Sequence, residues 1–423
     1  MTVVTEPSLG DWLERLNALD PTRIELGLTR VRPVAEALGV LNPQVQVVTV
    51  AGTNGKGSTL ALAESIALAD GRRVGCYTSP HILRFNERVR VNGQEASDAD
   101  IVAGLEAVES ARGETPLTYF EFITLAALWQ FQQQALDCWL LEIGLGGRLD
   151  VVNVVDPDVS VITSIGLDHM DWLGPDRDAI AVEKAGILRA GRPVICGESE
   201  PPATLDARLR AHDGRVWRAG DEALHWTEGT PWSLRVANTR WTGLPAPGVA
   251  GVCGRRNAAM AIAALLATGR PPSDAAVRAG LAAARIPGRL QVIAQTPETL
   301  VDTAHNGQAA AFLAQSLAAR PLAAGRMQCV LSMLADKDPG AVVSEFLRHW
   351  PAERPVDWLF VDSPGPRGQR AATIRDRAEM DGRCYNTLGG ALDAARRAAG
   401  PAGRVVCFGS FLTVEAALRH AHD

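Results

Sequence analysis

The sequence predicts an α/β protein with two parallel-sheet domains, and three observations support this fold class. Short apolar segments typical of buried strands alternate with longer segments of helical periodicity. A Gly-rich turn, Thr53–Ser58, joins one such strand to a helix. A second alternating series follows Pro287 and Gly288. We therefore expect a P-loop-type parallel sheet domain covered by helices over residues 1–286, followed by a smaller Rossmann-like α/β domain over residues 287–423.

The elements of the first domain follow from the same alternation. Apolar runs rich in Val, Ile and Leu predict strands at 46–50, 74–77, 139–143, 159–165 and 193–197. Apolar residues at helical spacing predict helices at 58–70, 120–135, 178–188 and 257–266. Residues 201–250 differ, because Trp, Thr, Pro and Gly are scattered through them. This segment is expected to be a small antiparallel or irregular excursion.

The second domain repeats the pattern with its own strands and helices. Its expected strands read TLVDTAH, MQCVLSML, DWLFVD and RVVCFGS. Helices are expected at 308–319, 341–350 and 388–399, with one more after Ser410. Strands separated by helices again predict a parallel sheet.

The composition excludes several classes of protein. The 423 residues are 47% hydrophobic and 21% charged, with a formal net charge of −6, so a general nucleic-acid-binding surface is not expected. No apolar run has the length of a membrane span, and the N-terminus is acidic where a signal peptide would be basic. Seven cysteines without a C-x-x-C pair predict free thiols in a reducing compartment. We expect a cytoplasmic protein, with a monomer as the default.

The three lysines stand out because the other basic residues are all arginine. Lys56, Lys184 and Lys337 are the only lysines among 42 basic residues. Since arginine fills the ordinary charged positions, each lysine is a candidate for a role that needs a compact ammonium or an amine.

Ligands of open parallel sheets bind at the carboxyl ends of the strands, and the first such end carries the Gly-rich turn. The turn departs from G-x-x-x-x-G-K-[ST], because Val50 replaces the first glycine and Gly57 follows the lysine. Backbone N–H groups of the turn and of the next helix can still hold a phosphate, with Lys56 as a point charge. The alternative is a plain turn between a strand and a helix.

Three further strand ends carry side chains suited to a metal ion. Ser79, Glu142 and His169 each follow or close a predicted strand, and hard oxygen ligands suit Mg²⁺ bridging to phosphates. Each residue also has an ordinary structural alternative, as a turn, a capping carboxylate or a structural histidine. Lys184 lies on a predicted helix, where it is either a solvated charge or, close to a metal, a carbamate formed with CO₂.

Nine segments together resemble the dihydrofolate synthase/folylpolyglutamate synthase family. They are AGTNGKGST, YTSPHILRFNERVRVNG, LTYFEF, LEIGLGGRLDVVN, TSIGLDHMDWLG, EKAGI, PGRLQVI, DTAHN and FGSF. Counting the early match at residues 24–26, the resemblance runs in order from about residue 24 to about residue 415. The glycine loop alone would indicate only the wider Mur ligase superfamily. One departure is Gly307, where the family has proline after Ala-His-Asn, and we expect this to loosen the turn.

The resemblance implies roles for individual residues. The ATP-binding residues would be Thr53, Asn54, Gly55, Lys56, Gly57, Ser58, Asn257, Arg289 and Asp302. The metal ligands would be Ser79, Glu142 and His169, binding Mg²⁺ as two ions, with Lys56, Lys184 and His169 catalytic and Lys184 modified to N6-carboxylysine. The pteroate or folate site would comprise Ile24, Glu25, Leu26, Thr118, Tyr119, Phe120, Glu121, Leu149, Asp150 and Val151. His305 and Ser410 would lie on the glutamate side, although Ser410 also suits a helix N-cap.

The implied activity is ATP-dependent amide ligation. ATP would phosphorylate a carboxylate to an acyl phosphate, which the amine of L-glutamate attacks. The expected acceptors are 7,8-dihydropteroate and the γ-carboxyl of reduced folates. A monofunctional folylpolyglutamate synthase is an open alternative. A peptidoglycan Mur ligase is disfavoured, since the loop near residue 47 leaves little room for a preceding UDP-binding domain. A non-catalytic nucleotide-binding module would not need Arg289 and Asp302 in a second domain.

Overall fold

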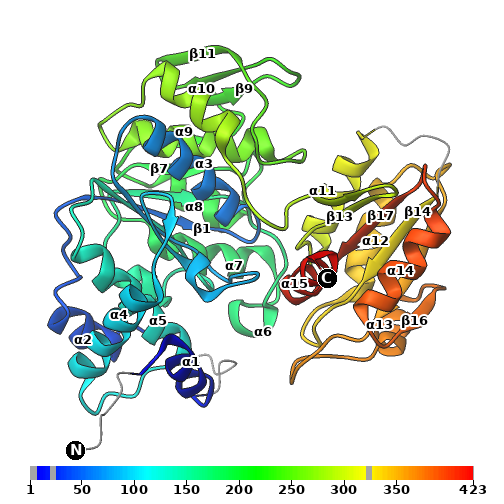
Figure 1. Cartoon of the computed structure of the whole chain (residues 1–423). Coiled ribbons are helices and arrows are strands. Elements are labelled where there is room, and N and C mark those ends of the chain that lie inside the picture. Colours follow the sequence, from blue (N-terminus) through cyan, green and yellow to red (C-terminus); the bar gives the residue numbers. More distant parts are fainter. Residues whose placement is uncertain (1–6, 20–24, 321–325, 423) are drawn as a thin grey trace, which may run out of the picture. The chain divides into compact units, whose positions relative to one another are not determined.

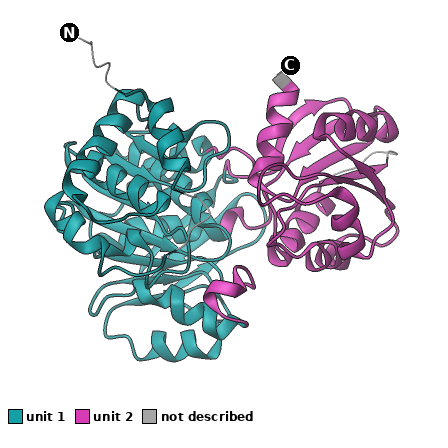
Figure 2. Ribbon diagram, turned by 90° about the horizontal axis from the view of Figure 1, so that it is seen from below, with its two compact units in different colours: residues 1–165, 176–247, 256–284 teal, residues 166–175, 248–255, 285–423 magenta. Residues whose placement is uncertain are grey.

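The computed structural model describes residues 7–19, 25–320 and 326–422, and two compact units make up the chain. They are coloured separately in Figure 2. The first unit comprises residues 1–165, 176–247 and 256–284, and the second comprises 166–175, 248–255 and 285–423. Both short segments of the second unit fall within the range 1–286 expected for the first domain. The α/β fold class is confirmed, because each unit has a sheet of mostly parallel strands with helices packed on it (Figure 1).

The main sheet of the first unit has eight strands in the order β4-β3-β2-β5-β1-β6-β7-β8. Its strands are β1 (Gln46–Ala51), β2 (Val74–Tyr77), β3 (Val89–Val91), β4 (Gln94–Glu95), β5 (Cys138–Glu142), β6 (Val159–Ile162), β7 (Val194–Cys196) and β8 (Val216–Arg218). The six strands from β2 to β8 in this order are parallel, whereas β3 pairs antiparallel with both β2 and β4. The carboxyl ends of β2, β5, β1 and β6 are therefore neighbours along one edge of the sheet.

Several helices of the first unit begin at a residue whose side chain caps them. They are α1 (Leu9–Asn17), α2 (Val31–Ala37), α3 (Lys56–Ala69), α4 (Asp98–Arg112), α5 (Tyr119–Gln132), α7 (Arg177–Lys184), α8 (Ala203–Arg210), α9 (Gly254–Ala267) and α10 (Asp274–Ala283), with 3₁₀ turns η1 (Phe85–Arg88), η2 (Val151–Val154) and η3 (Ala185–Ile187). Ser97 and Thr118 cap α4 and α5 through reciprocal bonds with the residue three positions later.

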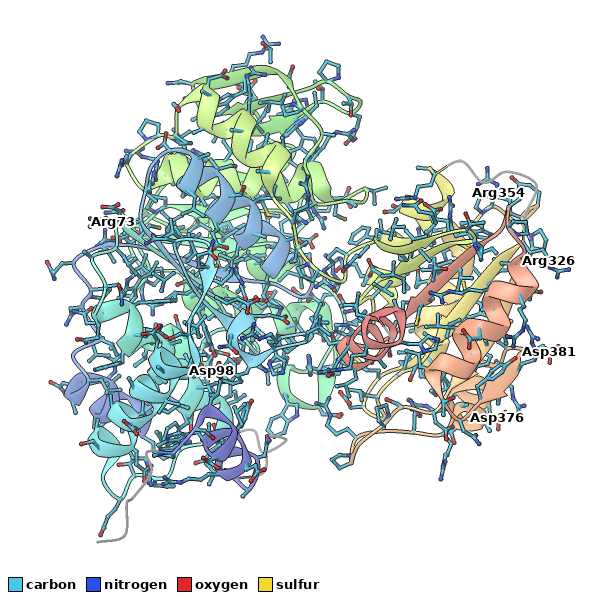
Figure 3. All side chains as sticks on the ribbon, viewed as in Figure 1. Arg73, Asp98, Arg326, Arg354, Asp376 and Asp381 are labelled. Carbon is cyan, nitrogen blue, oxygen red and sulfur yellow. The ribbon has the colours of Figure 1, made fainter. Side chains whose placement is uncertain are left out.

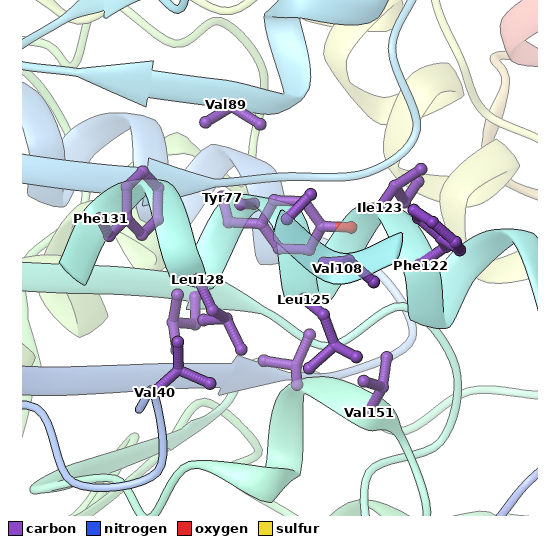
Figure 4. Close-up of a cluster of buried hydrophobic side chains, with 14 of the residues drawn as sticks. Val40, Tyr77, Val89, Val108, Phe122, Ile123, Leu125, Leu128, Phe131 and Val151 are labelled. Carbon is purple, nitrogen blue, oxygen red and sulfur yellow. The ribbon is translucent and has the colours of Figure 1, made fainter. Parts of the chain in front are cut away.

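Helix α5 is apolar on nearly every side because it lies inside the unit. Phe122, Leu125, Leu128 and Phe131 are at most 3% exposed and belong to the cluster of buried side chains in Figure 4. Burying each such side chain stabilises the fold by about 1.5–3 kcal/mol. Tyr77 also lies in this cluster, and its phenol shares a hydrogen bond of 2.8 Å with the hydroxyl of Thr124 on α5. The helix is thereby fixed against β2.

Within residues 201–250, expected to be a small antiparallel or irregular excursion, the first part supplies α8 and β8, and residues 224–244 form a separate small sheet. Its three antiparallel strands are β9 (Leu224–Trp226), β10 (Trp232–Val236) and β11 (Thr239–Leu244), in the order β11-β10-β9. The expectation of an antiparallel excursion is confirmed.

The second unit contains a six-stranded sheet in the order β12-β13-β17-β14-β15-β16. Its strands are β12 (Gln291–Gln295), β13 (Glu298–Val301), β14 (Met327–Leu331), β15 (Val356–Val361), β16 (Arg383–Tyr385) and β17 (Arg404–Phe408). Only β12 is antiparallel to its neighbour among these strands. The helices are α6 (Met170–Leu173), α11 (Gly307–Ala318), α12 (Pro339–His349), α13 (Ala371–Ala378), α14 (Leu388–Ala399) and α15 (Phe411–His422).

The outer faces of both units carry charge. Arg73, Asp98, Arg326 and Asp381 are exposed, and Arg73, Arg326 and Asp381 lie at the edge of the view in Figure 3. Within the described residues, no helix combines the length and apolar character that crossing a bilayer requires.

Candidate active site

The Gly-rich turn is held in one shape by the neighbouring strand β6. The amide of Thr53 donates to the carbonyl of Ser164 at 2.8 Å, and the amide of Asn54 donates to the Ser164 hydroxyl at 3.0 Å. The hydroxyl of Thr163 donates back to the Asn54 carbonyl at 2.7 Å. These bonds join the residues that follow β1 to those that follow β6, and the two strands are adjacent in the sheet. The turn is thus a preformed loop at the carboxyl edge.

Two glycines allow this close packing. Gly52 has φ +153°, and a Cβ there would lie 1.8 Å from the Thr163 hydroxyl. Gly55 has φ +90°, and a Cβ there would lie 2.9 Å from the side-chain oxygen of Asn257. Val50 stands where the standard phosphate-binding pattern has its first glycine. Gly52 supplies the close backbone approach two residues later.

The start of α3 fits an anionic phosphate. The helix begins at Lys56 with Gly55 as its N-cap, and no side chain caps the first-turn amides. The ammonium of Lys56 donates to the Gly52 carbonyl at 3.0 Å, so it lies over the turn. Asn257 on α9 is 4% exposed, and its side-chain oxygen has no hydrogen-bond partner among the described residues. Positive charge, uncapped amides and this buried acceptor match the requirements of a nucleotide.

Two of the three predicted metal ligands lie together in the first unit. Ser79 follows β2 and Glu142 ends β5, and the two strands are parallel neighbours. The amide of Ser79 donates to the Glu142 carboxylate at 3.2 Å, and Glu142 is only 4% exposed. This hydroxyl and carboxylate offer the hard oxygen atoms that Mg²⁺ prefers. The described residues contain no cluster of three or more His, Cys, Asp or Glu suited to a metal.

His169, the third predicted ligand, belongs to the second unit. It has φ +52°, a left-handed conformation that is uncommon for residues other than glycine. Its amide donates to the carboxylate of Asp168 at 2.9 Å. The backbone of His169 is therefore held by the side chain of Asp168. Asp168 belongs to the same LDH motif but was not selected as a site residue from the sequence.

Lys184 ends helix α7 and is 4% exposed. The alternative of a solvated helical charge is therefore excluded. Burial of an ammonium or a carbamate requires polar partners, which agrees with a specific role for this lysine. Its carbamylation stays a prediction.

The residues predicted to bind pteroate gather in the first unit, apart from Ile24, which lies outside the described residues. The amide of Gly27 donates to the Leu149 carbonyl at 3.2 Å, so the early segment lies beside Leu149 and its neighbours. A Cβ on Gly144, which follows β5, would lie 2.4 Å from the Phe120 ring. The structure thus groups Glu25 and Leu26, the start of α5, and Asp150 and Val151.

Within this group, Glu121 already has partners in the protein. Its carboxylate accepts from the Thr118 amide at 2.7 Å and from both terminal nitrogens of Arg30 at 2.9 and 3.0 Å. Burial raises the pKa of Glu121, and the amide of Thr118 and the charge of Arg30 oppose that rise. Thr118 and Glu121 therefore cap α5. Arg30, which was not selected from the sequence, donates to both Glu121 and Glu25 and so links the start of α5 to the segment that carries Glu25.

Asp150 is the other buried carboxylate of the group. It accepts from the amides of Leu145 and Val152 at 2.8 and 2.9 Å. Burial raises its pKa to about 6, although these amides and the charge of Lys56 lower it.

The raised pKa of Asp150 predicts a pH-dependent stability. Because the folded pKa of about 6 lies above the ordinary 3.8, the protonated form favours folding. Asp150 therefore stabilises the fold below about pH 4, and this contribution of roughly 3 kcal/mol is lost as the pH rises to 6 and above. We expect the melting temperature of Asp150→Asn to rise relative to that of the wild type as the pH increases from 4 to 7, because only the wild type ionises at this position. A difference that is constant over this range would contradict the assignment.

The predicted residues of the second unit lie near the ends of β13 and β17. The carboxylate of Asp302 accepts from the amides of Leu290 and Ala304 at 2.9 and 2.8 Å, and burial raises its pKa. The Arg289 guanidinium lies 5.5 Å from the ring centroid of Phe411, and the His305 ring lies 6.2 Å from the same ring. Phe411 is the last residue of the FGSF motif, and both side chains therefore lie beside a motif residue to which the sequence analysis gave no role.

Ser410 and Asn306 both act as helix caps. The Thr413 amide donates to the Ser410 hydroxyl at 3.0 Å, and the Ala309 amide donates to the Asn306 side chain at 3.0 Å. Asn306 thus caps α11 even though Gly307 replaces the proline of the family. The glutamate-side role of Ser410 stays a prediction beside this structural one.

Comparisons with known proteins identify the family of the chain. Residues 50–265 match the Mur ligase middle domain, and residues 288–411 match the Mur ligase glutamate ligase domain. The dihydrofolate synthase/folylpolyglutamate synthase of Escherichia coli K12 is 44% identical over 406 residues, covering 96% of this chain and 94% of that protein. The chain belongs to the dihydrofolate synthase/folylpolyglutamate synthase family.

Two solved structures of this family superpose on the whole chain. E. coli FolC in complex with DHPP and ADP is 42% identical with a TM-score of 0.91, covering 98% of this chain and 97% of that chain. The Yersinia pestis enzyme complexed with AMPPNP and Mn is 41% identical with a TM-score of 0.90, covering 99% and 98%. The resemblance predicted from the nine motifs is confirmed.

Proposed function

We propose that this chain is an ATP-dependent ligase that adds L-glutamate to 7,8-dihydropteroate and to the γ-carboxyl of reduced folates. The observation that carries the proposal is the site of the first unit, where the glycine loop and the Ser79–Glu142 pair lie at one sheet edge. Relatives that cover nearly the whole chain bear both activities in their names, and solved relatives hold ADP, AMPPNP, Mn or DHPP.

We assign a role in the reaction to each of the predicted site residues. Thr53, Asn54, Gly55, Lys56, Gly57 and Ser58 bind the ATP phosphates, and Asn257, Arg289 and Asp302 are proposed as further nucleotide contacts. Ser79, Glu142 and His169 would hold divalent metal, which would supply positive charge to the phosphates, and Lys184 would act as a carbamate. Lys56 stabilises charge on the transferring phosphoryl group.

The new amide forms in two reaction steps, a nucleophilic attack at phosphorus followed by one at the carbonyl carbon. The acceptor carboxylate attacks the terminal phosphorus of ATP, giving an acyl phosphate and ADP. The neutral amine of L-glutamate then attacks the carbonyl carbon, phosphate leaves with the bonding electrons, and the amine proton passes to solvent. The acceptor binds at the residues predicted for pteroate, around Glu25, Phe120 and Asp150. His305 and Ser410 lie on the glutamate side. Because an acyl phosphate hydrolyses in water, the site must exclude water during this interval.

We also propose that the protein acts as a cytoplasmic monomer on small molecules, without nucleic-acid or membrane partners. All seven cysteines are free, and five of them are buried in strands or beside the cores. Free thiols suit a reducing compartment.

The test is glutamate incorporation with ATP and Mg²⁺, with products identified by mass. Dihydropteroate and tetrahydrofolate are offered in separate reactions. We expect one glutamate on dihydropteroate and one or more on tetrahydrofolate. Addition to tetrahydrofolate alone would make the enzyme a monofunctional folylpolyglutamate synthase. ATP binding without addition to either acceptor would refute the ligase proposal.

A further inference from the structure

In the second unit, the carboxylate of Asp168 is surrounded by donors from two strand ends. The Lys337 ammonium donates to it at 2.6 Å, the Asn306 amide at 3.1 Å, and the His305 ring nitrogen Nε2 lies 3.3 Å away. His305 and Asn306 follow β13, and Lys337 lies in the turn after β14. The Asp168 and Lys337 side chains are 10% and 8% exposed. The segment 166–175 is thus fastened to this unit through a buried ion pair.

The turn that carries Lys337 accepts hydrogen bonds from two side chains, Gln369 and Arg377. The side-chain amide of Gln369 donates to the carbonyls of Met333 and Leu334 at 3.3 and 3.0 Å. The Arg377 guanidinium donates to the carbonyls of Ala335 and Lys337 at 3.2 and 2.6 Å, and to the Gln369 side chain at 3.1 Å. Nearly every carbonyl of the turn therefore has a donor from α13 or the loop before it. Such a turn has little freedom to move its lysine.

The identity of the residue also matters, because this chain otherwise uses arginine for positive charge. Lys337 is one of three lysines among 42 basic residues. Its ammonium also lies 3.4 Å from ring nitrogen Nε2 of His169. A compact ammonium fits between a carboxylate and an imidazole where a planar guanidinium would need more space.

We propose that Lys337 is a positioning residue. It holds Asp168 and thereby sets the backbone of the segment 166–175 that presents His169, while Arg377 and Gln369 keep the lysine in place. The left-handed backbone of His169 is a conformation that surrounding contacts must maintain, and the Asp168 carboxylate accepts from the His169 amide itself. The importance of His169 for metal binding rests on the proposed function, whereas the positioning of the segment does not.

Hydrogen exchange in the full-length protein without ligands tests the positioning directly. The amides of Trp172, Leu173 and Gly174 donate to carbonyls of His169 and Met170, so their exchange reports opening of the segment. We expect Lys337→Met to speed exchange in the 166–175 peptide about tenfold or more. Arg377→Ala is expected to speed exchange at residues 333–338 and, less strongly, at 166–175.

Arg375→Ala is the matched control, because Arg375 lies on the same helix and its guanidinium pairs with the adjacent Asp376. It should leave both peptides unchanged. If Lys337→Met does not fold, the peripheral Arg377→Ala variant decides the question. Unchanged exchange at 166–175 in both variants, with or without a higher KM for glutamate, would overturn the proposal. A wild type that exchanges as expected but ligates no glutamate would refute the proposed function alone.

A double-mutant cycle adds a readout that a purely local role would not give. Asp168→Asn and Lys337→Met should each raise the Mg²⁺ concentration needed for half-maximal activity by about tenfold. The double variant should be no worse than either single variant, because both remove the same link. Fully multiplicative effects would show that the two residues act independently and would contradict the proposal.

Discussion

Lys56→Ala is expected to lower ATP-dependent glutamate ligation by about 10³-fold or more. The ammonium lies over the glycine turn, 3.0 Å from the Gly52 carbonyl, at the start of α3. Loss of a cation that stabilises a transferring phosphoryl group costs several orders of magnitude in rate. The measurement is the initial rate of glutamate incorporation at saturating ATP and Mg²⁺, with either acceptor.

The fold should survive this change, because Lys56 donates only one hydrogen bond to the described residues. Arg210→Ala is the matched control, since it also removes one positive charge from a helix of the first unit and its side chain is 77% exposed. The control should keep full activity. Comparable activity of Lys56→Ala and the control, at equal melting temperatures, would remove the phosphate-binding role of the loop.

Glu142→Gln is expected to lower activity about 10²-fold at low Mg²⁺ and to recover part of it as Mg²⁺ rises. Glutamine keeps an oxygen that can accept from the Ser79 amide, so the local structure is retained while the negative charge is lost. A divalent cation held by a hydroxyl and a carboxylate loses most of its attraction when the carboxylate becomes neutral. The measurement is the dependence of the ligation rate on Mg²⁺ concentration.

Glu109→Gln provides the comparison for Glu142. Glu109 lies on α4 and pairs with Arg112 on the same helix. Its replacement should leave the Mg²⁺ dependence unchanged. If Glu142→Gln lost activity equally at every Mg²⁺ concentration, Glu142 would serve the structure of the strand end and not the metal.

Some features of the site followed from short stretches of sequence. The strand β1, the turn and the helix α3 were predicted within two or three residues, because apolar patterning and glycine act locally. The placement of Ser79 beside Glu142 also followed, since parallel neighbours bring their carboxyl ends to one edge. Helix α14 was predicted at its observed bounds, 388–399.

Other features depend on residues far apart in the chain. Arg30 joins Glu121 across 91 positions, and Lys337 joins Asp168 across 169. The strands β3, β12 and β16 and the helix α13 were also missed, because short half-exposed segments carry a weak periodic signal. Their structure is fixed by pairing with neighbours that the sequence does not reveal.

The sequence by itself thus determined the alternation of strands and helices, the glycine loop and the family, because these depend on local patterning and on ordered motifs. The tertiary structure alone decided which charged side chains are buried together. It placed residues 166–175 with the second unit and gave Asp168 its donors from the ends of β13 and β14. A carboxylate loses its hydration on burial, so its stability depends on partners that only the folded chain brings within hydrogen-bonding distance.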